Sequence, residues 1–473
     1  MKLTQKPVWK PGIIRLFVLL FAGVQFVHAQ EKLTLQQALQ LAVDNYGTVK
    51  AKAHYAEASA VAVDQAKRDY LPNFVLAGQQ DYGTVNGQTG PLYGFGGYGV
   101  SSSGPTLPAQ NWNAAFGALY LAHINWEFFA FGKAKEHIQV AKELARVDDK
   151  DYQQTLFNHQ VKVAAAYLNL LAAQQLTKSY EKNLHRADTF RQVVVTRALN
   201  GLIAGVDSSM ANAEVSNAKI AFTKAKDFEQ EKANLLAQLM GVAPQDFVLD
   251  TQFISHIPEG MEEPIAADTL SHPTLQWYQA RMALGEERQQ YLKTLYYPSF
   301  SLVGVFQTRG SGFQSDYSLN QRAYTTNYFD GIHPTRTNYL IGIGVNWNIS
   351  QPLRVSKQVK SQRLVNEGLH NEYELAEQQI QAQLHLADSK IQNALANYYE
   401  VPVQVQAASD AFLQKSVLYK NGLTNLVDVT QALYTLTRAE TDRDIAYNNV
   451  WQALLYKAAA TGDFSLFVQH VHP

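Results

Sequence analysis

The feature that most constrains this chain is an internal duplication. Residues 70–78, YLPNFVLAG, are matched by residues 296–304, YYPSFSLVG. Residues 199–209, LNGLIAGVDSS, are matched in the same way by residues 420–430, KNGLTNLVDVT, and a further pair, INWEF and VNWNI, falls between these two in the same order. Three matches in one order predict a tandem repeat of about 220 residues, so the two halves should share one folding plan.

Each half reads as helix, strand, glycine-rich loop, strand, long helix, tip and helix. Pro72 and Pro298 end the first helix of each half, because proline biases the residue before it towards extended structure. Alternation of apolar and polar residues then predicts strands. The predicted elements are helices at 33–70 and 274–297, strands at about 73–82, 114–126, 299–308 and 338–349, and long helices at about 130–200 and 353–420.

The first long helix is unusual in its length. The stretch from Lys133 to Asn200 contains neither glycine nor proline. As one helix it would be roughly 100 Å long, at 1.5 Å per residue. A globular domain has no use for such a length, so the sequence predicts a coiled-coil wall or stalk. In the second half, Gly368 and Pro402 are expected to interrupt the matching helix, with a kink near Pro402.

The segments outside these elements complete the predicted organisation. The N-terminus carries basic residues ahead of a short apolar run that ends at Ala29, which is the pattern of a cleaved signal peptide. Four prolines between 242 and 273 predict an irregular segment. The chain is thus divided into a signal peptide at 1–29, a first repeat at 30–241 with its tip at 200–207, an irregular equatorial segment at 242–273, and a second repeat at 274–473 with its tip at 421–428.

One strand indicates contact with lipid. No segment after the signal peptide is long and apolar enough for a transmembrane helix, so any membrane insertion must use β-structure. In the last strand one face is apolar and aromatic at its ends, as in membrane barrels; its members are Tyr339, Ile341, Ile343, Val345 and Trp347. Four strands cannot close a barrel, because the smallest membrane barrels have about eight. Several chains must therefore share one.

The duplicated joints between long helices carry the candidate functional residues. Gly201 and Gly422 are expected to adopt the left-handed conformation that ends a helix. Asp207 and Asp428 are expected to cap the next helix, with Gln431 completing a capping box in the second joint. Capping does not explain the repeated Leu202 and Leu423, and an apolar residue at an exposed tip suggests a docking partner.

Composition excludes several classes of function. The formal net charge is −1, so no basic field is available for nucleic acid. Cysteine is absent, which excludes disulfides, thiolate metal sites and an acylated N-terminal cysteine. The GFGGYG motif at 94–99 lacks the preceding strand and following helix of a dinucleotide site. The histidines are scattered, without metal-ligand spacing. We therefore predict no enzyme, no metal site and no cofactor.

The arrangement as a whole resembles the TolC family of outer-membrane efflux and secretion channels. The resemblance rests on the YLPNF and YYPSF corners, on Trp126 and Trp347 at the strand ends, and on the two Gly-Leu tips. It implies a mainly α fold with a β-barrel portion, in which the duplicated helix–strand–strand–helix halves form a long coiled-coil barrel. Four strands from each protomer would contribute to one trimeric, twelve-stranded membrane barrel, with the helices continuing across the periplasm.

The resemblance also implies a function. The protein would be the passive outer-membrane channel of a tripartite efflux or type I secretion system in a Gram-negative bacterium. It would form a homotrimer in outer-membrane lipid and work with a periplasmic adaptor and an inner-membrane pump of the RND or ABC type. The alternative is a secreted or surface helical stalk with a β-rich head and no transport.

Two groups of residues receive roles through the resemblance. The adaptor would grip the tips, which are Asn200, Gly201, Leu202, Asn421, Gly422 and Leu423. The periplasmic entrance would be formed by Asp428, Asp207 and Tyr419. Three Asp428 side chains close together in a trimer are expected to favour cations. An arginine found in the tip loop of TolC itself is replaced by Thr424, so any ion pair of the closed state must be built differently.

Overall fold

The structure is a computed structural model that describes residues 32–87, 106–258 and 271–471. The predicted signal peptide and the GFGGYG motif lie outside the described residues, as does part of the predicted equatorial segment. Within the described ranges, no helix has a stretch long and apolar enough to cross a bilayer.

Each half contains a pair of strands followed by a long helical hairpin. The first half comprises α1 (Leu35–Asn45), α2 (Gly47–Arg68), β1 (Asn73–Thr84), β2 (Ala114–Phe129), α3 (Lys133–Leu199) and α4 (Gly205–Met240). The second comprises α6 (Pro273–Thr294), β3 (Ser299–Ser311), the short α7 (Tyr328–Ile332), β4 (Arg336–Asn346), α8 (Gln351–Lys420) and α9 (Leu426–Thr461). The short helix α5 (Gln252–Ser255) lies between the halves, and α10 (Ser465–Val471) follows the second. The predicted duplicated order of helices and strands is confirmed.

Two helices differ from the prediction. The first predicted helix is broken at Tyr46, whose backbone is extended and whose ring stacks on His159 with centroids 3.9 Å apart. The helix α8, in contrast, runs for 70 residues through Gly368 and Pro402 without interruption. Proline removes one backbone hydrogen bond. The remaining backbone hydrogen bonds of this long helix keep α8 helical on both sides of Pro402.

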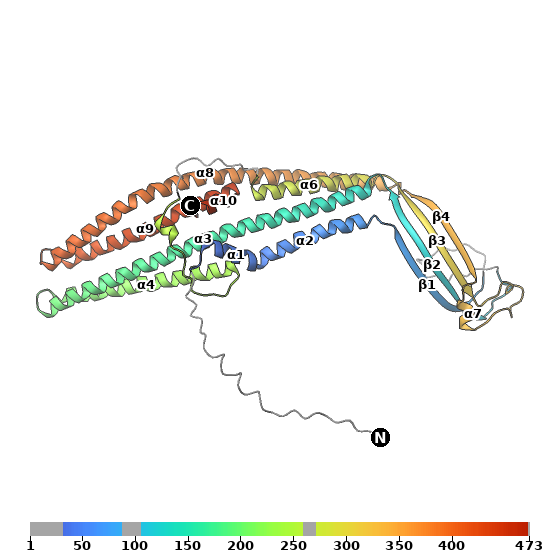
Figure 1. The fold of residues 1–473 in the computed structure, drawn as a ribbon, viewed down its shortest axis with the longest axis horizontal. Helices are drawn as coiled ribbons and strands as arrows, with labels where there is room; N and C mark the ends of the chain where they lie inside the picture. Colours follow the sequence, from blue (N-terminus) through green and yellow to red (C-terminus); the bar gives the residue numbers. More distant parts are fainter. Residues whose placement is uncertain (1–31, 88–105, 259–270, 472–473) are drawn as a thin grey trace, which may run out of the picture.

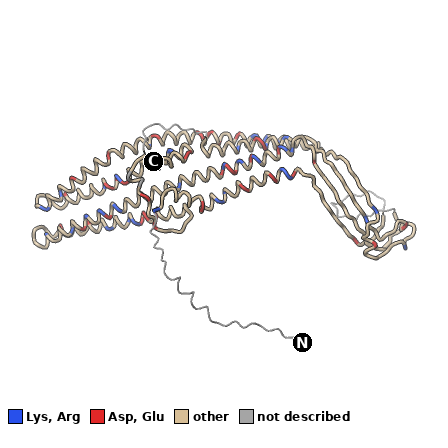
Figure 2. The backbone as a smooth tube through the Cα atoms, viewed as in Figure 1, with Lys and Arg blue, Asp and Glu red and all other residues tan. Residues whose placement is uncertain are grey.

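The molecule is elongated, with the sheet at one end and the tips of two helical hairpins at the other (Figure 1). The α3–α4 and α8–α9 hairpins lie side by side, and their tips are adjacent. Charged residues are spread along the helices and are sparse on the strands (Figure 2). The two ends therefore differ in chemistry as well as in secondary structure.

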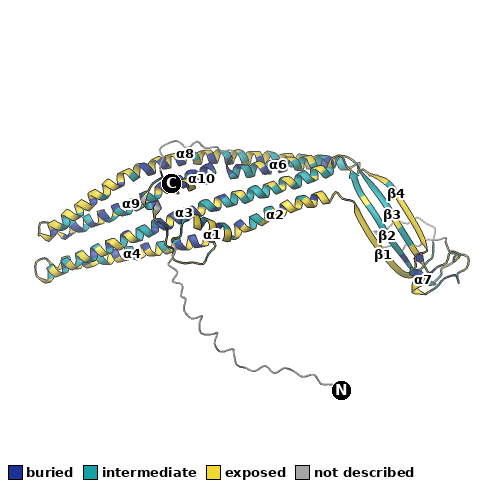
Figure 3. Cartoon of the chain, in the orientation of Figure 1, coloured by how far each residue is buried: buried dark blue, intermediate teal, exposed yellow. Residues whose placement is uncertain are grey.

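The main core lies in the middle of the molecule, where α1, α3, α9 and α10 meet (Figure 3). Tyr167 on α3 is fully buried there and packs edge-to-face against Phe253. Its hydroxyl donates to the carbonyl of Leu33 at 2.7 Å and accepts from the N–H of Asp250 at 3.2 Å. The Tyr167 side chain thus joins the start of the first repeat, at Leu33, to the segment that follows the first repeat, at Asp250.

The four strands form one antiparallel sheet in the order β1-β2-β3-β4. Among the described strands, β1 and β4 each have a single neighbour, and most of their residues are exposed. Residues directly opposite each other share a face, and one face carries Phe300, Leu302 and Phe306 beside the predicted row on β4. The sheet therefore has two unpaired edges and one apolar face.

The same contact builds both corners between sheet and helix. The indole N–H of Trp126 donates to the carbonyl of Tyr70 at 2.9 Å, and that of Trp347 donates to the carbonyl of Tyr296 at 3.3 Å. Trp347 was predicted as a strand residue, and this is wrong, because β4 ends at Asn346. Its bond to the corner places Trp347 where the chain already turns towards α8.

Candidate functional site

The two tips close their helices with identical backbone geometry. Gly201 has φ +71° and Gly422 has φ +75°, so the predicted left-handed conformation is confirmed. The N–H of Leu202 donates to the carbonyl of Arg197 at 3.0 Å, and that of Leu423 donates to the carbonyl of Leu418 at 2.9 Å. This six-to-one bond beside a left-handed glycine is the Schellman motif. The repeated Gly-Leu pair is thus a helix stop that fixes the direction of the leucine.

Both tip leucines point into solvent. Leu202 is 66% exposed and Leu423 is 72% exposed. Asn200 and Asn421, the residues that precede the glycines, are exposed as well. Two apolar side chains held outside the core by the same turn form a surface that nothing in the described chain covers.

The caps of the following helices were assigned to the wrong residues. The cap of α9 is Asn425, whose side chain accepts from the N–H of Asp428 at 2.9 Å. Asp428 therefore lies in the first turn, and Gln431 is not part of a capping box. In the first joint α4 begins after Ala204, so Asp207 also lies in the first turn. Carboxylates there still interact favourably with the helix dipole.

Asp428 is held by two neighbours within its own hairpin. Its carboxylate accepts from the ammonium of Lys415 on α8 at 2.9 Å and from the hydroxyl of Thr424 at 2.8 Å. These two contacts lower the pKa of Asp428 below its ordinary value, so the group is ionised at neutral pH. Lys415 supplies a balancing positive charge, so this tip presents an ion pair rather than a bare carboxylate.

Tyr419 and Arg197 join the two hairpins at the tips. Tyr419 is 3% exposed and packs among Val194, Leu426 and Val429. The Arg197 guanidinium lies 5.5 Å from the centroid of the Tyr419 ring and donates to the backbone carbonyls of Tyr419 and Lys420, at 2.8 and 3.0 Å. A cation placed on the last carbonyls of α8 also complements the dipole of that helix.

The first tip also contributes a charge close to Tyr419. Burial, and secondarily the carboxylate of Asp207, raises the pKa of the Tyr419 hydroxyl. The structure therefore brings Asp207 and Tyr419 together from the two hairpins. Arg197, Lys415 and Asn425 were missed from sequence, although a basic residue in the last turn of a helix is a recognisable signal for Arg197.

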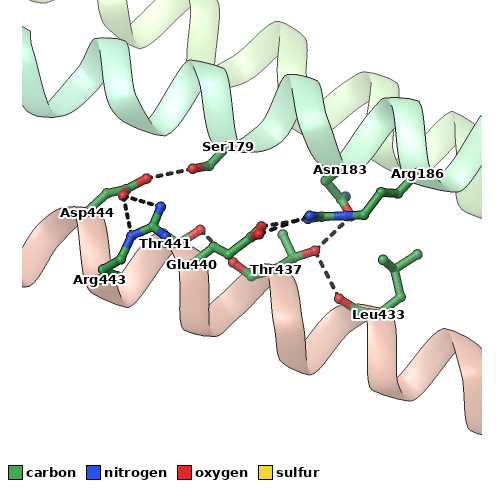
Figure 4. A network of polar contacts seen from close by, with 9 residues as sticks. All are labelled: Ser179, Asn183, Arg186, Leu433, Thr437, Glu440, Thr441, Arg443 and Asp444. Carbon is green, nitrogen blue, oxygen red and sulfur yellow. Dashed lines mark hydrogen bonds and ion pairs between the residues drawn. The ribbon is translucent and has the colours of Figure 1, made fainter. Parts of the chain in front are cut away.

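A second polar contact between the hairpins lies farther from the tips, where α3 faces α9 (Figure 4). Arg186 donates to both carboxylate oxygens of Glu440, at 3.0 and 2.6 Å. On one side of this pair, the Thr437 hydroxyl donates to the Asn183 side chain at 2.7 Å. On the other, the Ser179 hydroxyl donates to Asp444 at 2.6 Å. We call these six residues the seam.

The predicted lipid-facing residues lie on the outermost strand of the sheet. Tyr339, Ile341, Ile343 and Val345 are between 62% and 81% exposed. Directly opposite them on β3 lie Phe306, Gly304, Leu302 and Phe300. The exposed row on β4 thus continues an apolar surface rather than standing alone.

Comparison with known proteins finds one matching family model and several solved structures of similar fold. Residues 38–242 match the family model described as outer membrane efflux protein. No curated protein sequence matches the chain at a significant level.

Solved structures match over most of the chain. The outer-membrane channel OprN has a TM-score of 0.71 at 16% identity, over 91% of this chain and 90% of its own. The Campylobacter jejuni CmeC outer membrane channel has a TM-score of 0.71 at 14% identity, over 90% and 85%. The outer membrane protein VceC of Vibrio cholerae has a TM-score of 0.70 at 15% identity, over 91% and 96%. At these identities the likeness shows a shared fold.

Proposed function

We propose that the chain is the outer-membrane channel of a tripartite efflux or type I secretion system, because residues 38–242 match the outer membrane efflux protein family and its fold is that of solved outer-membrane channels. One observation carries the proposal. Among the described residues, a four-stranded sheet with an exposed apolar face and two unpaired edges is joined directly to two helical hairpins. The longer helices of these hairpins, α3 and α8, have 67 and 70 residues.

The unpaired edges support a homotrimer. An open sheet edge is not tolerated in lipid, because its backbone N–H and C=O groups find no partner there. If β4 of one copy pairs with β1 of the next, three copies supply twelve strands and leave no edge. Twelve is within the range of known membrane barrels. The apolar row on β4 then faces the hydrocarbon, and the hairpins project into the periplasm.

The tips support docking of an adaptor that brings an inner-membrane pump of the RND or ABC type. Leu202 and Leu423 offer exposed apolar contacts on rigid turns, and such contacts are typical of interaction surfaces. Adaptor binding that favours separated tips would shift the assembly towards the open state, since a ligand displaces an equilibrium only by its preference for one state. The Arg197 contacts with α8 join the two hairpins at the tips and would be lost if the hairpins separated.

Transport itself would be passive. The cargo moves through a water-filled passage, driven by the pump, and no catalytic group is required of this chain. The competing function is a structural stalk, which needs neither a closed barrel nor a lumen.

Flux through reconstituted protein separates the two functions. Liposomes that contain the full-length protein and a trapped small anionic dye should release the dye when Arg197→Ala loosens the tips. Protein-free liposomes, carried through the same procedure, set the background. A folded, membrane-inserted protein that releases no dye in this variant would favour the stalk and contradict the channel.

A further inference from the structure

The strand register divides the sheet into two faces. The face opposite the apolar row is mixed: it carries polar and small residues, among them Gln79, Asn125, Gln307, Asn338, Gly342 and Gly344, and also the apolar Val75, Leu119, Leu121, Val303, Val305 and Leu340. In a barrel whose apolar row meets lipid, this opposite face lines the pore. We call it the pore face.

Two arginines stand directly opposite each other on the pore face. Arg309 on β3 is paired in register with Arg336 on β4, next to the ends of these strands that are far from the helices. Both side chains are exposed, and neither guanidinium has a side-chain partner within the described residues. Cβ atoms of directly opposed residues are about 5 Å apart, and like charges at that spacing destabilise a sheet. Repulsion between the two guanidinium groups therefore lowers the stability of the sheet, and the pairing of the strands does not offset this loss.

Acidic side chains are few and distant on this face. Glu127 lies at the helical end of β2 and is paired with Lys133 at 3.0 Å. Asp81 lies on β1, two strands from Arg309, and accepts from the Gln79 amide at 2.6 Å. Asp330 lies on α7, which packs on the apolar face, where Tyr328 donates to Gln80 at 2.7 Å. The loop sequence from 88 to 105 contains no Asp or Glu.

From this placement we infer that Arg309 and Arg336 form an anion-binding ring at the outer mouth of the pore, and that the cargo class is anionic, bearing carboxylate or phosphate groups. The inference rests on the proposed trimer, in which three copies bring six guanidinium groups to one level. Guanidinium binds such groups through paired N–H donors. Rings of arginine are a recurrent device of anion-conducting pores.

The register also separates this site from membrane lipid. Arg309 and Arg336 lie on the face opposite Phe306 and Tyr339, so lipid headgroups meet the other side of the strands. The ligands that reach the pair are those inside the pore.

Calorimetric titration of the detergent-solubilised full-length protein with inorganic tripolyphosphate tests the inference without requiring an open entrance. We expect R309Q/R336Q to weaken binding about tenfold or more, because it removes charge-assisted hydrogen bonds. R309K/R336K, which keeps the charge, should retain most of the binding. R322Q is the matched control, since it removes one arginine from the β3–β4 connection, outside the strands.

Two results would overturn the inference. Binding that is equally strong in R309Q/R336Q and R322Q would place the anion elsewhere. Absence of binding in the wild type would mean that the arginines are already neutralised. If D81N then created binding, the neutralising group would be Asp81 of a neighbouring copy. Light scattering on the same samples reports the trimer separately, so a failure of the proposed assembly is recognised independently of the titration.

Discussion

Removing Arg197 should loosen the contact between the two hairpins without unfolding either. In the structure its guanidinium makes two hydrogen bonds to the last carbonyls of α8 and lies over the Tyr419 ring. A hydrogen bond to a charged group contributes about 1.5–3 kcal/mol net. Because Arg197 is only half-buried, solvent screening lowers the value of the whole contact to about 1–2 kcal/mol per protomer.

The effect multiplies in a trimer whose three tips open together. Loss of the contact in all three protomers changes the free energy of opening by about 3–6 kcal/mol, so the ratio of open to closed channels rises by a factor on the order of 10² to 10⁴. Single-channel recording in a planar bilayer measures this ratio as open probability. We therefore expect Arg197→Ala to be open for a much larger fraction of the time than the wild type.

Arg191→Ala is the matched control for this experiment. Arg191 lies on the same helix and pairs with Asp188 of that helix at 2.8 Å, so its removal changes the same charge without separating the hairpins. An open probability that is equal in Arg197→Ala and Arg191→Ala would refute the argument that the tip contact between hairpins holds the entrance closed.

Five further predictions concern contacts at the tips, the core and the seam. Leu202→Asp/Leu423→Asp should leave the melting temperature nearly unchanged, because both side chains are exposed, yet abolish adaptor binding in a pull-down; retained binding would remove the tips from the interface. Gly201→Ala/Gly422→Ala should destabilise each tip by about 1–2 kcal/mol, since both glycines have positive φ, and faster hydrogen exchange confined to the tips would show it. The contacts that lower the pKa of Asp428 stabilise the tip at pH values above the ordinary aspartate pKa of about 3.9, and this stabilisation is lost as the pH falls through the lowered pKa. Protection of the tip amides from hydrogen exchange should therefore be constant from pH 7 to pH 5 and fall in stronger acid. Asp428→Asn should abolish that fall. Tyr167→Phe should cost about 1 kcal/mol, because the Leu33 carbonyl and the Asp250 N–H each lose one hydrogen bond and keep only their bond to each other at 3.3 Å. Glu440→Ala leaves Arg186 unpaired in the seam and should lower the melting temperature more than Glu440→Ala/Arg186→Ala does.

The repeat made much of the fold predictable from sequence. Prolines 72 and 298 mark real helix-to-strand corners, and the glycine-free stretch after Lys133 is one helix. Local rules failed where tertiary contacts compete with them. The break at Tyr46 has only Gly47 as a local signal, and the Tyr46 ring stacks on His159 there; α8, in contrast, continues through Pro402.

The site was predictable in its backbone and not in its side-chain partners. Positive φ at Gly201 and Gly422 follows from the Gly-Leu pattern, because few other residues accept that conformation. The partners of Asp428 and Tyr419 come from other helices, and Arg197 reaches α8 across the gap between two hairpins. A single sequence does not give the spacing between those helices. The opposition of Arg309 and Arg336 likewise depends on strand register, which the loop between β3 and β4 does not reveal.

Cysteine cross-linking between β1 and β4 tests the shared barrel most directly, because the chain contains no cysteine of its own. Leu76→Cys would be combined in turn with Ile341→Cys, Ile343→Cys and Val345→Cys, which sample three heights on β4. Within one chain these strands are three spacings, or about 14 Å, apart, so a disulfide inside a protomer is excluded. A barrel closed by three copies requires that at least one pair yields covalent species that end at the trimer. Monomers alone at all three heights, or a ladder extending beyond the trimer, would contradict a closed barrel built from three copies.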